Sequence, residues 1–249
     1  MGYPRLRIRT AIVYLSILSF FLLQNCSAQT VNTHLIQDEI ETVTVEKLAY
    51  YLYYPQAYEV NENESFPLLL FLHGGGEAGG TLSEVKSNGP PKLIAEGKQF
   101  PYLILAPQNP HKRKWWNTQA IMQLLDTVVK TNRVDPKRIY LTGLSRGGSA
   151  AWELAVQYPD KFAAMAVVCG MTPVPYASWL DKDMPIWVFH GEDDASIPVS
   201  ESDEMVKKLK AMGRNVTYTR YKGVGHNAWE KAYANEELYE WFVQYERKQ

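Results

Sequence analysis

The sequence predicts an α/β fold with a mostly parallel central sheet flanked by helices. Short apolar, β-branched and aromatic runs alternate along the chain with segments whose apolar residues recur at helical spacing. Repeated strand-helix units of this kind imply parallel strands joined by right-handed crossovers. The 249 residues are 46% hydrophobic with a formal net charge of −1, which suits one sizeable core and gives no indication of nucleic-acid binding.

The first 28 residues have the pattern of a secretory signal peptide. Three arginines precede an apolar run over residues 11–23, and small residues lie at the positions before a cleavage site. The run is shorter than the roughly 18 residues expected of a spanning helix. We therefore expect cleavage after Ala28, a single domain over residues 29–249, and a secreted or periplasmic protein without membrane association. Lipidation at Cys26 is the alternative, although the polar residues just before it depart from the usual lipidation motif.

Strand and helix segments then follow in order along the chain. Residues 42–45 and 48–54 suggest antiparallel strands at the start of the domain. Ser200 with Asp203 suggests a capping box at a helix start. Cys169 follows an apolar run and is expected to be a buried structural thiol. Further strands are expected at residues 68–72, 102–107, 138–142, 185–189 and 216–221, and helices around residues 121–128, 151–158, 205–212 and 238–245.

The most informative stretch is residues 143–147, which reads Gly-Leu-Ser-Arg-Gly between an expected strand and an expected helix. A serine hydroxyl is a weak nucleophile, so it must be held on a tight turn where a base can reach it. Gly143 and Gly147 supply small neighbours that let the backbone pass, which makes Ser145 a candidate nucleophile. Ordinary glycine-rich turns also match this short pattern, so a nucleophilic Ser145 requires a matching acid and histidine elsewhere in the sequence.

Candidate acid and base residues lie downstream, each on a loop after an expected strand. Three adjacent carboxylates, Glu192 to Asp194, come first, and His226 follows in a glycine-rich loop. Serine, acid and histidine in this order match the triad order of α/β-hydrolases. The carboxylate would fix the imidazole tautomer and stabilise the imidazolium, and any of the three could do so. Four histidines are expected to be structural: His34, His73, His111 and His190.

A triple glycine follows the expected strand at residues 68–72 and ends at Glu77. Glycines let backbone N–H groups converge on one point, where they stabilise the negative charge that acyl transfer builds on a carbonyl oxygen. We expect one donor from this loop and the other from the N–H of Arg146, the residue after the candidate nucleophile. A phosphate-binding loop is the alternative, but neither Gly-Lys-Ser/Thr nor G-x-G-x-x-G at a helix start accompanies the glycines.

In combination these motifs resemble single-domain carboxylesterases of the α/β-hydrolase superfamily. The nearest group spans feruloyl and acetylxylan esterases, polyhydroxybutyrate-depolymerase-like esterases and so-called predicted peptidases, and the resemblance covers roughly residues 48–249. The group's acid loop reads H-G-x-x-D-x-x-V-P, which implies Asp194 as the acid, with Asp193 as the alternative. Residues 223–229 resemble the group's histidine loop, and Gly75 is the implied first oxyanion donor.

Two differences between this sequence and the group that it resembles bear on which substrate it binds. Many relatives have methionine or glutamine where this chain has Arg146, whose guanidinium could favour anionic or carbohydrate-linked substrates or pair with a carboxylate. Larger relatives insert a cap where this chain has only residues 171–179, so the resemblance implies a minimal cap and an open cleft. Trp116 and Glu77 are candidates for substrate contact. The stretch Trp115-Trp116-Asn117 could offer an aromatic wall for a sugar or phenolic ring, although tryptophans also pack beneath loops.

The resemblance implies a serine esterase that hydrolyses short-acyl, aryl or carbohydrate-linked esters through an acyl-enzyme. Ser145 would attack, His226 would transfer the proton, Asp194 would orient His226, and the N–H groups of Gly75 and Arg146 would hold the oxyanion. The implied partner is a small or polysaccharide-linked ester, with no cofactor and no metal. Alternatives are a serine peptidase on the same fold, although the propeller domain of oligopeptidases is absent, and a catalytically silent carbohydrate- or ligand-binding module, although the triad is complete.

Overall fold

The computed structural model describes residues 46–60 and 62–247. The expected signal peptide, the strand expected at residues 42–45, Cys26 and His34 lie outside these described residues. Within the two ranges, no helix has both the length and the apolar character needed to cross a bilayer.

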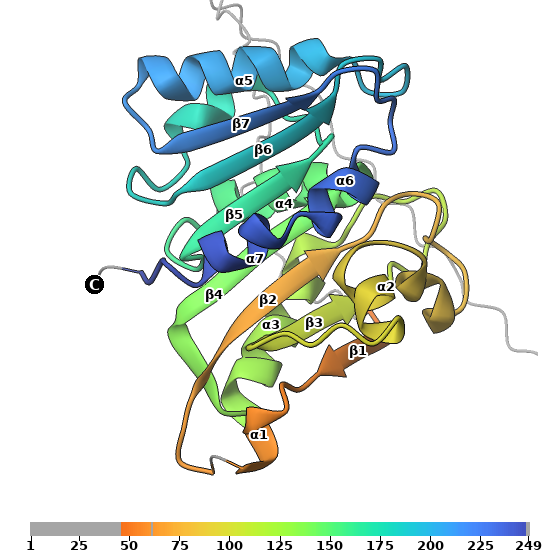
Figure 1. Ribbon diagram of the computed structural model, residues 1–249, viewed down its shortest axis with the longest axis vertical. Coiled ribbons are helices and arrows are strands. Elements are labelled where there is room, and N and C mark those ends of the chain that lie inside the picture. The colour runs from red at the N-terminus through yellow and green to blue at the C-terminus, as the bar shows by residue number, and fades with distance from the viewer. Residues whose placement is uncertain (1–45, 61, 248–249) are drawn as a thin grey trace, which may run out of the picture. The chain divides into compact units, whose positions relative to one another are not determined.

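A seven-stranded sheet forms the centre of the described part (Figure 1). The strand order is β1-β3-β2-β4-β5-β6-β7, in which β1 pairs antiparallel with β3 and every other neighbouring pair is parallel. The predicted mostly parallel α/β sheet is confirmed. The strands are β1 (Tyr50–Tyr53), β2 (Phe66–Leu72), β3 (Leu103–Pro107), β4 (Val134–Leu144), β5 (Ala164–Val168), β6 (Ile186–Gly191) and β7 (Val216–Tyr221).

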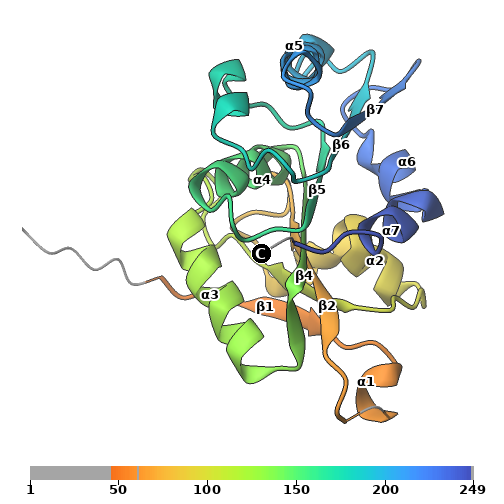
Figure 2. The same ribbon diagram turned by 90° about the vertical axis from the view of Figure 1, so that its left-hand side faces the viewer.

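Helices cover both faces of this sheet (Figure 2). The helices α3, α4 and α5 lie against one face, and α2, α6 and α7 lie against the other. The helical elements are α1 (Ala57–Val60), the 3-10 helix η1 (Leu82–Ser87), α2 (Gly89–Ala95), α3 (Thr118–Thr131), α4 (Arg146–Gln157), the 3-10 helix η2 (Val174–Ser178), α5 (Val199–Ala211), α6 (Trp229–Ala234) and α7 (Glu236–Phe242).

Strand β2 shows why the central strands appear as continuous apolar runs in the sequence. All seven of its residues are buried, because helices cover the sheet on both sides. Leu68, Leu70 and Leu72 belong to the core cluster that contains α3, α4 and α5 residues, whereas Leu69 and Phe71 belong to the opposite cluster. Each such buried side chain contributes about 1.5–3 kcal/mol relative to an exposed one.

The capping box expected at the start of α5 is absent, so that expectation was wrong. The helix begins two residues earlier than a Ser200 cap requires, at Val199, with Pro198 as its N-cap and no side-chain cap. Asp203 instead accepts a 2.7 Å hydrogen bond from the Tyr218 hydroxyl on β7. The carboxylate therefore ties α5 to the neighbouring strand rather than to its own first turn.

The turn between β4 and α4 holds Ser145 in a strained conformation. Its φ of 51° and ψ of −119° lie in a region that residues with a side chain rarely adopt. A Cβ on Gly143 would lie 2.3 Å from the Gly147 carbonyl oxygen, and one on Gly147 would lie 2.0 Å from the Leu72 carbonyl oxygen. Both positions therefore require glycine, because the backbones of β2, β4 and α4 pass too close for any side chain.

Replacing Gly147 with alanine should lower the free energy of unfolding by about 2–3 kcal/mol, because the added methyl group forces backbone apart. Urea unfolding followed by circular dichroism measures the change. Gly76→Ala is the matched control, since a Cβ there meets no atom within 4 Å. Its effect should stay within about 1 kcal/mol. Equal losses in the two variants would contradict a steric requirement for glycine at the turn.

Candidate active site

The loops after β4, β6 and β7 bring together the three side chains expected to form a triad. Ser145 follows β4, Asp194 lies three residues after β6, and His226 lies five residues after β7. These strands run parallel, so their carboxyl ends meet at one edge of the sheet. The structure therefore places the three residues in the spatial cluster that their order in the sequence predicted.

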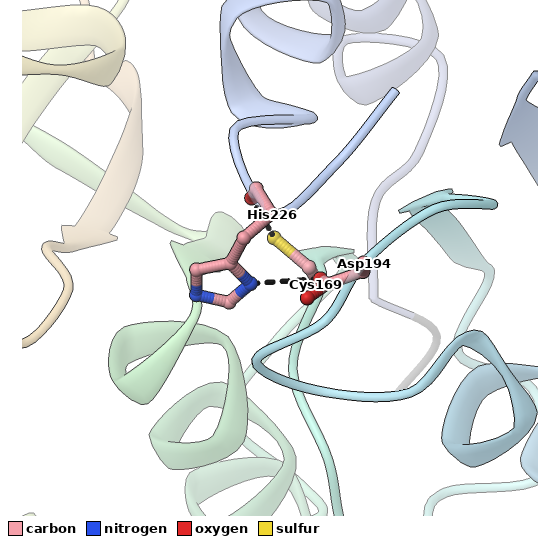
Figure 3. A group of neighbouring side chains, drawn as sticks. All are labelled: Cys169, Asp194 and His226. Carbon is pink, nitrogen blue, oxygen red and sulfur yellow. Dashed lines mark hydrogen bonds and ion pairs between the residues drawn. The ribbon is translucent and has the colours of Figure 1, made fainter. Parts of the chain in front are cut away.

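A continuous line of hydrogen bonds joins the three side chains. The Ser145 Oγ lies 2.9 Å from His226 Nε2, and His226 Nδ1 lies 2.7 Å from Asp194 Oδ2. Figure 3 shows the imidazole with Nδ1 directed at the carboxylate. With the proton on Nδ1, the ring donates to Asp194 and leaves Nε2 to accept from the serine hydroxyl.

Asp194 is held as a buried, ionised acceptor. Its side chain is fully buried, and Oδ1 accepts hydrogen bonds from the N–H groups of Ser196 at 2.8 Å and Ile197 at 2.9 Å. Burial raises the pKa of this carboxyl, but its hydrogen bonds with the His226 ring and the two backbone N–H groups lower the pKa by more. The pKa of Asp194 therefore lies below its usual value, and the carboxylate stays charged beside the imidazole.

Asp193 occupies a different position from Asp194. Its side chain is exposed and forms no hydrogen bond or ion pair with any other described residue. Its backbone N–H donates to the Val224 carbonyl at 2.9 Å, which ties the acid loop to the histidine loop. Of the two aspartates considered from the sequence, Asp194 is the one that contacts His226.

His190 also contacts the Asp194 carboxylate, in addition to His226 and the two backbone N–H groups. It is fully buried, its Nε2 lies 3.2 Å from Asp194 Oδ2 and 2.9 Å from the Ile197 carbonyl oxygen, and its Nδ1 accepts from the Ser202 hydroxyl at 2.7 Å. The sequence suggested only a structural histidine here. Its place in the His-Gly pair that ends β6 is the signal that links it to the acid loop.

The histidine loop rests on Cys169, which has a positive φ of 40° just after β5. The thiol Sγ donates to the His226 carbonyl oxygen at 3.3 Å. Cys169, Asp194 and His226 offer ligand atoms within 4.8 Å of one another (Figure 3). A metal ligand here would have to be a thiolate, but burial raises the pKa of Cys169 to about 12. The expected buried structural thiol is thus what the structure describes.

Glu77, a candidate for substrate contact in the sequence, has little exposed surface in the structure. It is 5% exposed, and its Oε1 accepts from Asn88 Nδ2 at 2.8 Å. Asn88 in turn accepts from Trp229 Nε1 at 3.0 Å, and the Trp229 ring packs edge-to-face on His226 with centroids 5.2 Å apart. A buried carboxylate needs hydrogen-bond partners, and Asn88 supplies one to Glu77. Because Asn88 also binds Trp229, Glu77 supports the packing of Trp229 against the His226 ring.

Trp116 is also buried, which corrects its expected role as an aromatic wall. It is 5% exposed and packs against His73 with ring centroids 4.7 Å apart. Its neighbour Trp115 is 47% exposed and lines a groove of about 740 Å³. Ser149, one turn beyond Ser145 on α4, also lines this groove. Other aromatic and apolar lining residues include Met171, Tyr176 and Trp179.

The remaining described histidines have structural contacts. His73 is fully buried, donates from Nδ1 to the Gly74 carbonyl at 2.7 Å and accepts at Nε2 from the Asn109 N–H at 3.0 Å. Burial lowers the pKa of His73, which favours this neutral, singly protonated ring. His111 pairs with Glu46 at 3.1 Å.

Two backbone N–H groups near Ser145 have no hydrogen-bond acceptor among the described residues. Gly75 follows Gly74, where an added Cβ would lie 3.6 Å from the Ser145 Cβ, so the glycine loop borders the serine. Neither the Gly75 nor the Arg146 N–H donates to another described residue. These are the two donors that the sequence suggested for an oxyanion.

The strand order, the turn at Ser145 and the three-residue cluster are those of an α/β-hydrolase. A family model described as Phospholipase/Carboxylesterase matches residues 100–237, more than half of the chain. The chain therefore belongs to the phospholipase/carboxylesterase family.

Individual relatives agree with this assignment. A bifunctional acetylxylan esterase/xylanase from Neocallimastix patriciarum is 28% identical over 150 residues, which are 58% of this chain and 22% of the relative. A feruloyl esterase B from Thermothelomyces thermophilus is 26% identical over 135 residues, 49% of this chain and 43% of the relative. A crystal structure of a thermostable esterase superposes with a TM-score of 0.69 at 32% identity, covering 80% of this chain and 60% of that one. The chain spans less than half the length of these two curated relatives.

Asp194→Asn should lower the free energy of unfolding at pH 7 by about 1–3 kcal/mol, because buried donors lose a charged acceptor. The folded-state pKa lies below the usual 3.8, so this contribution is present above that value and is lost as the pH falls through the folded-state pKa. Urea unfolding at pH 7 and below pH 4 measures both effects. Asp193→Asn, which removes an exposed carboxylate, should change stability little at either pH. A deficit of Asp194→Asn that persists unchanged in acid would contradict the role of its charge.

Proposed function

We propose that this protein is a serine carboxylesterase. The observation that carries the proposal is the hydrogen-bonded line from Ser145 through His226 to Asp194, at 2.9 and 2.7 Å, in a member of a carboxylesterase family. A neutral imidazole that accepts from a serine hydroxyl and donates to a buried carboxylate has the arrangement needed to activate that hydroxyl.

In the proposed reaction, Ser145 Oγ attacks the ester carbonyl carbon while its proton passes to His226 Nε2. The carbonyl oxygen becomes an oxyanion, which accepts hydrogen bonds from the N–H groups of Gly75 and Arg146. His226 then gives the proton to the departing alcohol, leaving an acyl-serine. Water attacks this acyl group by the same route, and the carboxylic acid and free serine are released. Asp194 stays ionised throughout and stabilises the imidazolium.

Preorganised donors supply much of the rate in such a site. The N–H groups of Gly75 and Arg146 belong to backbone fixed by the close β2–α4 approach, so they need little reorganisation when charge develops. Removing one such donor typically costs about 3–4 kcal/mol of transition-state stabilisation. The strained turn at Ser145 contributes by keeping both the hydroxyl and the following N–H at the edge of the sheet.

We propose short-acyl, aryl or carbohydrate-linked esters as substrates. Between β5 and β6 the chain has only the short helix η2, which supports an open site rather than an enclosed acyl tunnel. The exposed Trp115 and the adjoining groove suit a planar or ring-bearing group. Relatives that are named acetylxylan and feruloyl esterases support this substrate class. A signal peptide over residues 1–28 would direct the protein out of the cytoplasm, and a relative from Arthroderma benhamiae is named a secreted protein.

A fluorophosphonate probe should label the wild-type protein once, at Ser145, and Ser145→Ala should lose both labelling and ester hydrolysis. Peptide mass spectrometry locates the label, and a panel of acetyl, feruloyl, short-acyl and peptide substrates measures turnover. Circular dichroism should show an unchanged fold in the variant, since alanine is smaller than serine. A folded wild-type protein that takes no label would refute the proposal, and turnover of peptides alone would favour a peptidase.

Esters from acetyl to butyryl should be preferred over long-chain esters. Each buried methylene contributes about 0.8 kcal/mol, so an acyl tunnel would raise kcat/KM over many carbons, which an open site does not. Trp115→Ala should lower kcat/KM for aryl or sugar esters more than for ethyl esters.

Trp116→Ala is the matched comparison for this prediction. It removes a buried ring, so it should lower the free energy of unfolding by about 3–5 kcal/mol. It should not lower kcat/KM for aryl or sugar esters more than for ethyl esters. A clear preference for long-chain esters, or equal losses on aryl and ethyl esters in Trp115→Ala, would contradict this role of the groove.

A further inference from the structure

The guanidinium of Arg146 packs against the glycine loop. A Cβ built on Gly75 would be 2.9 Å from Nη2, 3.2 Å from Cζ and 3.4 Å from Nε of Arg146. These three atoms form the Nε–Nη2 side of the guanidinium, so this side of the group packs on Gly75. The absence of a side chain at Gly75 is what admits the guanidinium beside the proposed oxyanion site.

One nitrogen of this guanidinium is held by the loop that carries Trp115. Nη1 donates to the Lys112 carbonyl at 3.0 Å and to the Lys114 carbonyl at 3.4 Å. The same loop contacts the glycine loop at Gly79, where an added Cβ would lie 2.5 Å from the Lys112 nitrogen. The guanidinium is therefore fixed in orientation, which reduces the entropy that a ligand must overcome to use it.

The Nε–Nη2 edge of the guanidinium has no hydrogen-bond acceptor in the described part of the chain. Among residues 46–60 and 62–247, Nε and Nη2 form no hydrogen bond, and no carboxylate lies within 4.0 Å of Arg146. The sequence left open whether an internal carboxylate pairs with Arg146, and none does in the described part of the chain. An Nε–Nη2 edge offers two parallel N–H donors, which is the geometry that binds a carboxylate in a bidentate manner.

The surroundings favour an anion on this side of the site. Lys112, Arg113 and Lys114 are exposed and form no ion pair with a described residue. The groove that Trp115 lines is also lined by Glu153 and Glu201, which would repel an anion. A negatively charged group near the reacting ester is therefore attracted toward Arg146 and away from the groove.

We propose that the Nε–Nη2 edge of Arg146 is a binding site for a carboxylate carried by the substrate, so that the enzyme favours esters with a negative charge close to the scissile bond. The inference rests on the proposed esterase function and adds a specificity determinant to it. The carboxylate belongs either to the acyl part or to the alcohol part of the ester, and matched substrates distinguish these two sources.

The test compares kcat/KM for two pairs of esters that differ only by a charge. The acyl pair is 4-nitrophenyl hydrogen succinate against 4-nitrophenyl butyrate, and the alcohol pair is 4-acetoxybenzoate against its methyl ester. After subtraction of spontaneous hydrolysis, the wild-type ratio of kcat/KM for the anionic ester to kcat/KM for the neutral ester should exceed one in the pair whose carboxylate binds Arg146. Arg146→Gln should lower that ratio about tenfold, mainly through a higher KM for the anionic ester, since a charged bidentate contact is lost.

Two comparisons distinguish a bidentate site at Arg146 from a general effect of protein charge, and a third checks that the preference is electrostatic. Arg146→Lys should retain part of the ratio, because it keeps the charge and loses the fork. Lys207→Gln, on the exposed side of α5, removes the same charge elsewhere and should leave the ratio unchanged. Raising the salt concentration should lower the wild-type ratio, because exposed charges are screened.

An unchanged ratio in both arms of Arg146→Gln, in a protein whose wild type still takes the fluorophosphonate label, would overturn the carboxylate site and leave the esterase proposal intact. Equal losses on charged and neutral esters would also overturn it, since Arg146 would then act on every substrate alike. A wild-type protein that hydrolyses no ester would refute the proposed function and this inference with it.

Discussion

The hydrogen bond between His226 and Asp194 is the interaction on which the rest of the site depends. It is 2.7 Å long, and it orients the imidazole so that Nε2 meets Ser145. The fold supplies it through the parallel pairing of β6 and β7, which places the acid and histidine loops side by side. His190 then supports the carboxylate at 3.2 Å from within the core. A low dielectric around these groups strengthens the contact and makes an unpaired carboxylate costly.

Close backbone approach is the second constraint, and it acts at the neighbouring strands. The glycines at 143 and 147 let β2, β4 and α4 pack without side chains between them, which forces Ser145 into its positive φ. The same packing brings the glycine loop beside the serine and leaves two N–H groups free. Gly75 has an added effect, because it makes room for the Arg146 guanidinium. The strained turn at Ser145, the two unpaired N–H groups and the fixed Arg146 guanidinium thus all result from the same close packing of backbone at glycines.

Much of this arrangement is predictable from the sequence because its causes are local. Buried strands such as β2 are continuous apolar runs, and the order of Ser145, Asp194 and His226 reflects strand order. The sequence predictions that were wrong concern side chains whose positions depend on packing between distant segments. Adjacent tryptophans look alike in sequence, yet Trp116 packs on His73 while its neighbour faces the groove. Glu77 follows the glycine loop that borders Ser145, but its Oε1 accepts a hydrogen bond from Asn88, a partner on another segment.

The measurement that tests the proposed triad and oxyanion site most directly is a crystal structure of the protein after reaction with a small alkyl fluorophosphonate, because the adduct mimics the tetrahedral intermediate. We expect a phosphorus atom bonded to Ser145 Oγ, with the phosphoryl oxygen about 2.7–3.1 Å from the N atoms of Gly75 and Arg146. His226 should remain hydrogen-bonded to Asp194 in the adduct. Phosphorus on another residue, or a phosphoryl oxygen directed away from both N–H groups, would contradict the proposed catalytic arrangement.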